Sequence, residues 1–307
     1  AEGLLQATFR AERDVGGPVV MGYMPYWRSP EWIPWETIDI LAWFNVDMNS
    51  DGSLGNNHGW DGASAAEVLD AAHSVGAEVV LSATLFDPEG IGQLVRSPSA
   101  RANAIDGLVN QMLDGGGDGI DIDFEGLLYE DKDDFVTFIT ELRAALEVAQ
   151  PGSLLTLATP AIDWDSAYDY DMLAAQADYL FIMGYAFAGS WSNPRPNAPL
   201  DASDPWGSRS LRWSVQNYLT WGGEENADKF LLGLPLYGNH WLSTTGDVGA
   251  IAVGGLWLCA TASPQVCGTH CGRLVAATAA CSCATARAQY SWQGQPEKED
   301  AAATCAE

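Results

Sequence analysis

Short apolar runs rich in β-branched residues recur along the first 235 residues of this 307-residue chain, and helix-like stretches separate them. Strands that alternate with helices favour a parallel sheet with its helices outside. The predicted strands are 19–24, 38–46, 78–84, 119–124, 154–159, 178–185 and 229–235, and the clearest helical stretches are 64–75, 102–113, 133–149 and 214–219. Ser64, with Glu67 three residues later, predicts a capping box at the first helix.

Seven strand–helix units of this kind favour a (β/α)8 barrel, which needs eight units and usually has about 250 residues. A doubly wound sheet would place a glycine-rich phosphate turn after its first strand. Residues 19–27 read VVMGYMPYW instead. We therefore expect an α/β TIM barrel whose eighth unit is missing or divergent.

Asp121, Asp123 and Glu125 form an alternating row of carboxylates in segment 115–126, which reads GGGDGIDIDFEG. On a strand they share one face, with neighbours about 7 Å apart. Carboxylates this close cannot all ionise freely, so some of their pKa values must rise. The row predicts acid–base chemistry at the carboxyl end of a barrel strand. A Mg²⁺ or Ca²⁺ site and a solvated acidic run are competing interpretations, and the bulky apolar residues between the acids favour a buried strand.

The spacing of Asp118, Asp121, Asp123 and Glu125 resembles the DxxDxDxE signature of glycoside hydrolase family 18, the chitinase-type (β/α)8 barrels. Other segments resemble the same family in the right order: Gly22-Tyr23, Phe44, Ala158-Thr159-Pro160, Met183-Gly184-Tyr185 and the run from Leu232 to Gly238. The resemblance covers about residues 18–250. It implies a glycosidase that uses neither a cofactor nor a metal.

The resemblance also implies roles for the acids. Glu125 corresponds to the general acid, and Asp123 to the residue that polarises the substrate's N-acetyl group, whose oxygen attacks the anomeric carbon. Asp121 is expected to share a proton with Asp123. Asp118 differs from these three in strand parity, so we expect it to be structural.

Substrate contacts are expected from tyrosine, methionine and aromatic side chains near strand ends. By resemblance, Tyr185 donates its hydroxyl to the N-acetyl oxygen and Met183 lines the pocket. The candidates for stacking on sugar rings are Tyr23, Phe44, Trp27 and Trp164. Core packing is at least as good an interpretation for each of these four alone, and Tyr23 has the best case.

Two departures from the family pattern stand out. The family has Asp directly after the tyrosine of the sixth strand, and this chain has Ala186. The family also has an eighth strand that bears a tryptophan. The segment 254–258, with Trp257, looks superficially like it, but only about 15 residues separate it from the seventh strand. That is too few for a helix and two loops.

The last 57 residues differ in composition from the rest. All six cysteines lie there, and the stretch is nearly neutral, whereas the whole chain has a net charge of −27. This stretch has three interpretations. Its cysteines could form three disulfides, or a zinc site that includes Cys267, His270 and Cys271. Alternatively, the sequence is foreign to the family, as a shifted reading frame would give. We favour the third, then disulfides. The expected organisation is an N-terminal segment 1–17, a catalytic barrel 18–250 and an atypical tail 251–307.

A chain this acidic disfavours nucleic acid and anionic membranes as partners, and it has no apolar run long enough to span a membrane. We expect a secreted monomer, without a visible signal peptide, that hydrolyses β-1,4-linked N-acetylglucosamine polymers, with chitin favoured. The alternatives are peptidoglycan or N-glycan cleavage, and a chitinase-like carbohydrate-binding protein with weak or no activity.

Overall fold

The computed structural model describes residues 17–260, apart from 29, 190 and 248. The chain divides into two compact units. Up to Ile182, together with Tyr218–Leu231, it forms the first unit, and Met183–Asn217 with the chain from Leu232 onward forms the second.

Seven strands form one sheet, in the same order as they follow one another along the chain. They are β1 (Met21–Pro25), β2 (Ile40–Asp47), β3 (Glu78–Leu85), β4 (Gly119–Phe124), β5 (Leu154–Pro160), β6 (Tyr179–Met183) and β7 (Phe230–Gly233). The pairings from β1 to β5 are parallel. The predicted α/β fold is confirmed, with seven parallel strands in barrel order.

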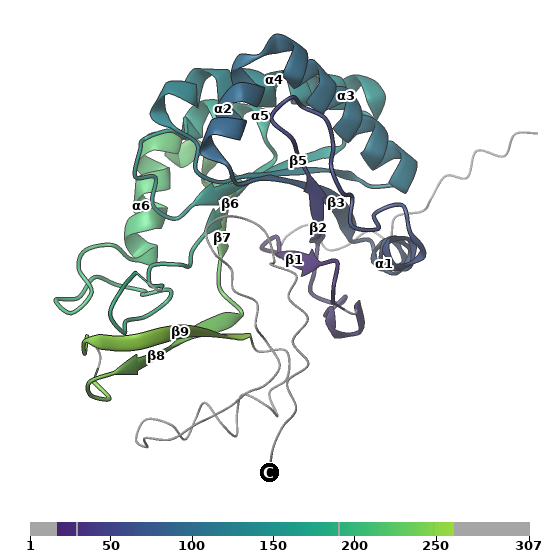
Figure 1. Ribbon diagram of the computed structural model, residues 1–307. Helices are drawn as coiled ribbons and strands as arrows, with labels where there is room; N and C mark the ends of the chain where they lie inside the picture. The colour runs from purple at the N-terminus through teal and green to yellow at the C-terminus, as the bar shows by residue number, and fades with distance from the viewer. Residues whose placement is uncertain (1–16, 29, 190, 248, 261–307) are drawn as a thin grey trace, which may run out of the picture. The chain divides into compact units, whose positions relative to one another are not determined.

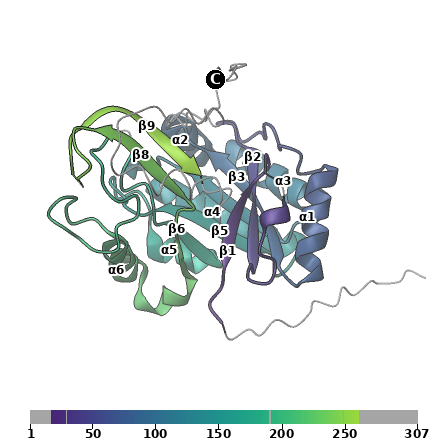
Figure 2. The ribbon, with the colours of Figure 1, turned by 90° about the horizontal axis from the view of Figure 1, so that it is seen from below.

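The helices of the first unit lie together on one side of these strands (Figures 1 and 2). They are α1 (Ala63–Ser74), α2 (Pro88–Arg96), α3 (Pro98–Gly115), α4 (Lys132–Ala149) and α5 (Tyr170–Gln176), and α6 (Leu211–Gly222) precedes β7. Apolar side chains of the strands and helices form the main core between them. A smaller cluster around Ile40, Ala42 and Val80 occupies the other face of the sheet.

The predicted capping box at the first helix is wrong. The residue at its N-cap is Gly62, no side chain caps it, and Ser64 lies inside the helix. Helix α2 was not predicted, although Asp87 caps it by accepting the N–H of Gly90 at 3.1 Å. Two glycines and a proline in α2 conceal its helical pattern in the sequence.

Three consecutive glycines precede β4. One of them allows close contact with a buried side chain, and another allows the chain to turn at the end of α3. A Cβ at Gly115 would lie 2.1 Å from Nε1 of the buried Trp60. Gly116 ends α3 in the left-handed conformation, with φ of +79°. The glycines thus end the helix and bring the chain directly into β4.

The second unit contains an antiparallel pair, β8 (Tyr237–Ser243) and β9 (Ala252–Ala260). Segment 254–258 lies in β9, so it is not a parallel barrel strand, in agreement with the short spacing. Residues 17–260 include no eighth strand of the parallel sheet. The predicted cysteine chemistry lies outside the described residues, apart from Cys259, which is in β9.

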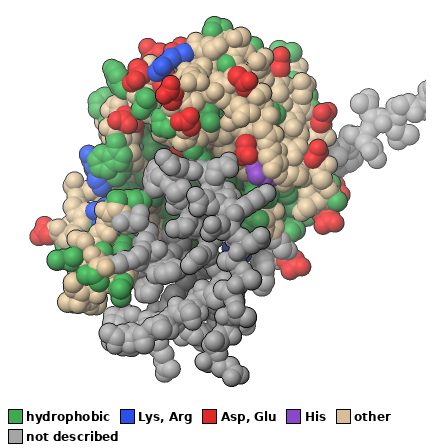
Figure 3. All heavy atoms as spheres, viewed as in Figure 1, with side chains coloured by type: hydrophobic (Ala, Val, Ile, Leu, Met, Phe, Trp, Pro, Cys, Tyr) green, Lys and Arg blue, Asp and Glu red, His purple; other side chains and the backbone are tan. Residues whose placement is uncertain are grey.

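Acidic side chains are scattered over the described part of the face in Figure 3, and basic side chains are few there. This agrees with the net charge of −27. Of the helices in the described part of the chain, none has the length and apolar character needed to cross a bilayer.

Candidate active site

Strand β4 presents its acids and its apolar residues to opposite faces, as its alternation predicts. Ile120, Ile122 and Phe124 are fully buried in the main core on the helix side. Asp121 and Asp123 are also buried, on the other face, and Glu125 directly follows the strand. The row therefore lies at the carboxyl end of a central strand.

Three hydroxyl groups surround Asp121. Thr156 of β5 donates to its Oδ1 at 2.6 Å, Ser82 of β3 donates to its Oδ2 at 2.8 Å, and Tyr23 of β1 donates to its Oδ1 at 3.2 Å. Ser82 and Thr156 stand directly beside Asp121 in the strand register. Burial raises the pKa of Asp121 to about 6, although all three hydrogen bonds favour the ionised form.

Asp123 lies between two other acids. Its Oδ1 is buried, and no described residue donates a hydrogen bond to it. Burial, and then the charges of Glu125 and Asp121, raise the pKa of Asp123 well above its usual range. Burial also raises the pKa of Glu125. These directions agree with the expectation that the crowded acids cannot all ionise, and they favour proton exchange along the row.

Of the four aromatic candidates, one, Tyr23, contacts an acid of the row. The other three lie nearer the surface. Besides its bond to Asp121, the ring of Tyr23 packs edge-on against Phe181, with centroids 5.0 Å apart. Phe44 in β2 is half-buried, and its ring contacts that of Trp27, with ring centroids 6.3 Å apart. Trp27 is 47% exposed, and Trp164, in the loop after β5, is 73% exposed.

The remaining family positions lie in the second unit. Met183 ends β6, and the ring of Tyr185 contacts that of Tyr237 edge-on, with centroids 6.0 Å apart. Ala186 has a φ of +58°, a conformation that Asn, Asp or Gly adopts more readily than Ala. Its N–H donates to Oδ1 of Asn197 at 3.0 Å.

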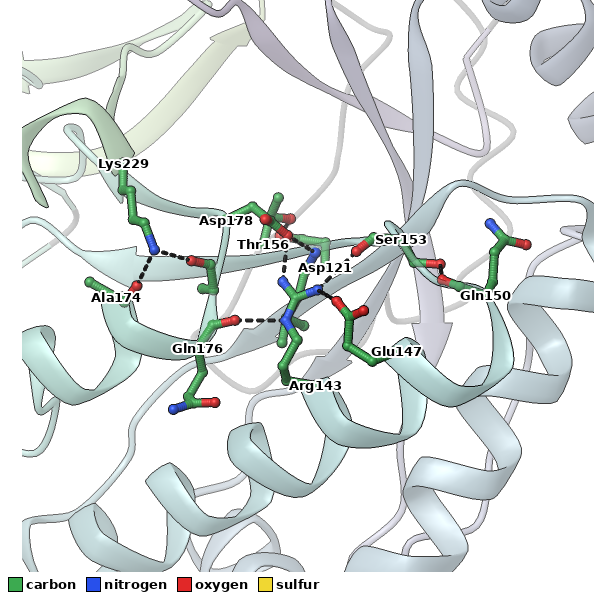
Figure 4. A network of polar contacts seen from close by, with 12 residues as sticks. Asp121, Arg143, Glu147, Gln150, Ser153, Thr156, Ala174, Gln176, Asp178 and Lys229 are labelled. Carbon is green, nitrogen blue, oxygen red and sulfur yellow. Dashed lines mark hydrogen bonds and ion pairs between the residues drawn. The ribbon is translucent and has the colours of Figure 1, made fainter. Parts of the chain in front are cut away.

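Asp118 lies at the other end of β4. Its Oδ2 accepts the N–H of Val79 at 2.8 Å and contacts Nε2 of His73 at 2.7 Å. At the corresponding end of β5 and β6, Arg143 donates to the carbonyls of Gln176 and Ser153, at 2.8 and 2.9 Å, and pairs with Asp178 (Figure 4). Polar contacts at this end join strands to one another and to α4.

Of the three residues whose hydroxyls surround Asp121, Tyr23 is a candidate from the sequence, whereas Ser82 and Thr156 are not. Ser82 and Thr156 are small hydroxyl residues inside apolar strands, at positions that share the parity of Asp121. This shared parity is the feature of the sequence from which Ser82 and Thr156 could have been predicted. Tyr168, whose hydroxyl donates to the carbonyl of Phe124 at 2.7 Å, comes from a loop and gave no such signal.

No group of three or more potential metal ligands comes together within the described ranges. Within the acid row, Asp121 is surrounded by three hydroxyl groups, which can donate to its carboxylate. The arrangement therefore suits proton transfer to and from a bound molecule.

Comparison with known proteins identifies relatives over this fold. A Bacillus subtilis protein, YdhD, whose name places it among sporulation-specific glycosylases, is 31% identical over 162 residues, which cover 51% of this chain and 36% of that protein. Chitinase 1 of Aphanocladium album is 30% identical over 162 residues, 49% of this chain and 38% of that protein. The matched region spans less than half of the length of these relatives.

Among solved structures, catalytic domain 2 of the Group II chitinase of Ostrinia furnacalis has a TM-score of 0.69. It is 21% identical, and the match covers 78% of this chain and 70% of that one. The profile of the glycosyl hydrolases family 18 matches residues 19–300. With the acid row of β4 placed at the carboxyl end of a seven-stranded parallel sheet, the chain belongs to glycosyl hydrolases family 18.

Proposed function

We propose that this protein hydrolyses β-1,4-linked N-acetylglucosamine polymers, with chitin as the favoured substrate. The observation that carries the proposal is the buried row on β4, in which burial raises the pKa values of Asp121, Asp123 and Glu125. A glycosidase needs a carboxylic acid that is still protonated near neutral pH, and a raised pKa supplies one. Family membership supports the class of reaction.

In this proposal Glu125 donates its proton to the glycosidic oxygen as that bond breaks. The acetamido oxygen of the substrate attacks the anomeric carbon, so the sugar supplies its own nucleophile. Asp123 accepts a hydrogen bond from the acetamido N–H and stabilises the positive charge that develops there. The Glu125 carboxylate then takes a proton from the water that opens the cyclic intermediate, which restores the acid.

Asp121 regulates the ionisation of Asp123 by sharing a proton with it. Each of its oxygens accepts a hydroxyl hydrogen bond at 2.8 Å or less, which lets Asp121 carry the negative charge when Asp123 is protonated. By resemblance, Tyr185 donates its hydroxyl to the acetamido oxygen and Met183 lines the pocket.

Aromatic rings bind the sugar faces in this proposal. Tyr23 has the strongest support, because its hydroxyl contacts Asp121. Trp27 and Trp164 are exposed and follow the carboxyl ends of β1 and β5, so their rings are accessible to a polymer. Phe44 contacts Trp27 and completes this set. The protein is proposed to act as a secreted monomer on a neutral polysaccharide.

A second candidate is a carbohydrate-binding protein with weak or no activity. Ala186 favours it, because this position lacks the carboxylate that the family pattern places after Tyr185. Ala186→Asp is compatible with the left-handed backbone there, since Asp tolerates that conformation better than Ala. If the activity of the protein is low, we expect Ala186→Asp to recover part of it. Peptidoglycan or N-glycan cleavage is a third candidate, because those substrates carry the same acetamido group.

The test is hydrolysis of a fluorogenic N-acetylglucosamine oligomer, with the matching glucose oligomer as the control. We expect cleavage of the first alone, and inhibition by a thiazoline mimic of the cyclic intermediate. Comparable cleavage of the glucose oligomer would mean that an enzyme carboxylate is the nucleophile. Binding of the N-acetylglucosamine oligomer without cleavage would favour the second candidate, and preference for peptidoglycan the third.

A further inference from the structure

The peptide bond between Phe124 and Glu125 is held from both sides. Its N–H, which belongs to Glu125, donates to the carbonyl of Leu85 in β3 at 3.1 Å. Its carbonyl, which belongs to Phe124, accepts a hydrogen bond from the Tyr168 hydroxyl at 2.7 Å. The second donor is a side chain from the loop between β5 and α5, at a place where a strand would ordinarily supply a backbone N–H.

Strand β5 cannot supply that N–H because of its own sequence. The ladder between β4 and β5 begins where the carbonyl of Asp118 accepts the N–H of Leu154 at 2.9 Å, and its pairs end at Ile122 and Leu157. In a parallel ladder, successive bonds on one side advance by two residues on each strand. The partner of the Phe124 carbonyl would therefore be the amide of residue 160. That residue is proline, which has no N–H.

We propose that Tyr168 is a positioning residue for Glu125: its hydroxyl replaces the strand donor that Pro160 lacks, and so fixes the peptide that carries the acid. This inference rests on the proposed function of Glu125 as the acid. It assigns Tyr168 no contact with substrate. Its effect passes through the backbone.

The surroundings of Tyr168 hold it in place and keep it a donor. The carboxylate of Asp163 accepts the N–H groups of Ala167 and Tyr168, at 3.0 and 2.9 Å. The ring packs edge-on against Phe135, with centroids 6.0 Å apart, and is buried. Burial, followed by the nearby charge of Glu125, raises the pKa of Tyr168 well above its usual range. The hydroxyl therefore keeps its proton at any pH at which the enzyme would work.

Loss of this bond should affect the chemical step more than substrate binding. A carboxylic acid must lie within hydrogen-bond reach of the leaving oxygen, and a small displacement of a catalytic group costs up to about 10²-fold in rate. The aromatic side chains that are proposed to bind the sugar belong to other parts of the chain than the Phe124–Glu125 peptide. The expected signature is a lower kcat with an almost unchanged KM.

The test compares Tyr168→Phe with Tyr218→Phe. Tyr218 is a matched control because it is also buried, at 0% exposure against 7% for Tyr168, and also donates to a backbone carbonyl, that of Pro160, at 2.9 Å. We expect Tyr168→Phe to lower kcat about tenfold or more, with KM within about twofold. Tyr218→Phe should lose a similar amount of thermal stability and keep kcat within about twofold. Equal effects of the two variants on kcat would overturn the proposal.

A rescue sharpens the test. Pro160→Ala restores an N–H at the ladder position, so adding it to Tyr168→Phe should recover at least about threefold in kcat. Failure of this rescue in a folded double variant would overturn the claim that the hydroxyl replaces a strand donor.

A measurement without substrate separates this inference from the proposed function. Hydrogen exchange of the Glu125 amide should be at least about tenfold faster in Tyr168→Phe than in Tyr218→Phe, because one of the two bonds that hold the peptide is lost. If the wild-type protein cleaves no N-acetylglucosamine oligomer and this difference is found, the proposed function fails while the positioning by Tyr168 stands. Equal exchange in the two variants would overturn the positioning.

Discussion

The two ends of the parallel strands carry acidic side chains in opposite settings. At the amino ends, Asp39, Asp118 and Asp178 each precede a strand, and each accepts a backbone N–H from within or directly before the neighbouring strand, at 2.8 Å in every case. Asp118 and Asp178 also contact basic side chains, His73 and Arg143 respectively. These acids join elements of the fold.

At the carboxyl end of β4 the acids face one another and neutral hydroxyls. Among the described residues, no ion pair reaches Asp121, Asp123 or Glu125. Burial without a compensating cation destabilises their ionised forms and raises their pKa values. An acidic side chain therefore stabilises the sheet at one end and opposes its stability at the other, according to its partners.

The largest expected effect is on turnover, at the carboxyl end. Glu125→Gln keeps the size of the side chain and removes the proton donor, so we expect kcat to fall by several orders of magnitude. General acid catalysis alone is worth about 10²–10⁴-fold. Sugar binding should survive. The matched control is Glu147→Gln, a half-exposed acid beside Arg143 at the amino end, which should leave kcat unchanged. Activity of Glu125→Gln within tenfold of the wild type would remove Glu125 from this role.

The next effect concerns the pH dependence of the free energy of unfolding. The folded pKa of Asp121, about 6, lies above its ordinary value of 3.8. Its proton therefore favours the folded state fully below pH 3.8, and this contribution declines as the pH rises to about 6. Asp121→Asn cannot lose a proton there. We expect the wild type to lose up to about 3 kcal/mol relative to this variant between pH 4 and pH 7.

Urea unfolding at pH 4.0, 5.5 and 7.5 measures that difference. Asp106→Asn, in an exposed position of α3, is the control and should follow the wild type at every pH. Parallel pH curves for the wild type and Asp121→Asn would show that Asp121 ionises normally, and the contrast between the two ends would then lose its main support.

A smaller effect is expected at the amino end, on stability alone. Asp178→Ala leaves the N–H of Leu155 without its carboxylate acceptor and removes an ion-pair partner of Arg143. Because the Asp178 side chain is 40% exposed, we expect a loss of about 1–3 kcal/mol in the free energy of unfolding rather than the full cost of breaking a buried pair. Well below the melting temperature, kcat should not change. A large fall in kcat with native stability would mean that this end contributes to the chemistry.

The smallest effect is expected for His73→Gln. The His73 side chain is 42% exposed, and Asp118 keeps the N–H of Val79 without it. We expect a loss below about 1 kcal/mol, as is usual for exposed pairs. Thermal unfolding of His73→Gln beside Asp118→Asn would show whether the pair or the backbone bond stabilises β4.

Much of the sheet could be predicted from local sequence. The alternation of Ile and Phe with acids in β4 fixes which side chains face the helices, because a strand has a period of two residues. The same pattern did not reveal α2, where Pro88, Gly90 and Gly92 resemble a loop, although Asp87 and Pro88 are also a normal helix start.

The contacts that complete the candidate site depend on distant pairings. Ser82 and Thr156 reach Asp121 only because three strands align in one register, and no local pattern states that register. The donation from Tyr168 to Phe124 joins residues 44 positions apart. The antiparallel pairing of β8 with β9 is likewise set by long-range contacts, and it was not predicted.

The three aspartates at the amino ends also divide the sheet into pairs. Asp39 precedes β2 and bonds to Val20 beside β1, Asp118 precedes β4 and bonds to β3, and Asp178 precedes β6 and bonds to β5. A polypeptide cut between α1 and β3, or between α4 and β5, keeps every such bond within one fragment. A cut between β3 and β4 separates the acceptor from its donor. For reassembly from two separately made pieces, the favourable breakpoints are therefore those that leave an even number of strands on the first piece.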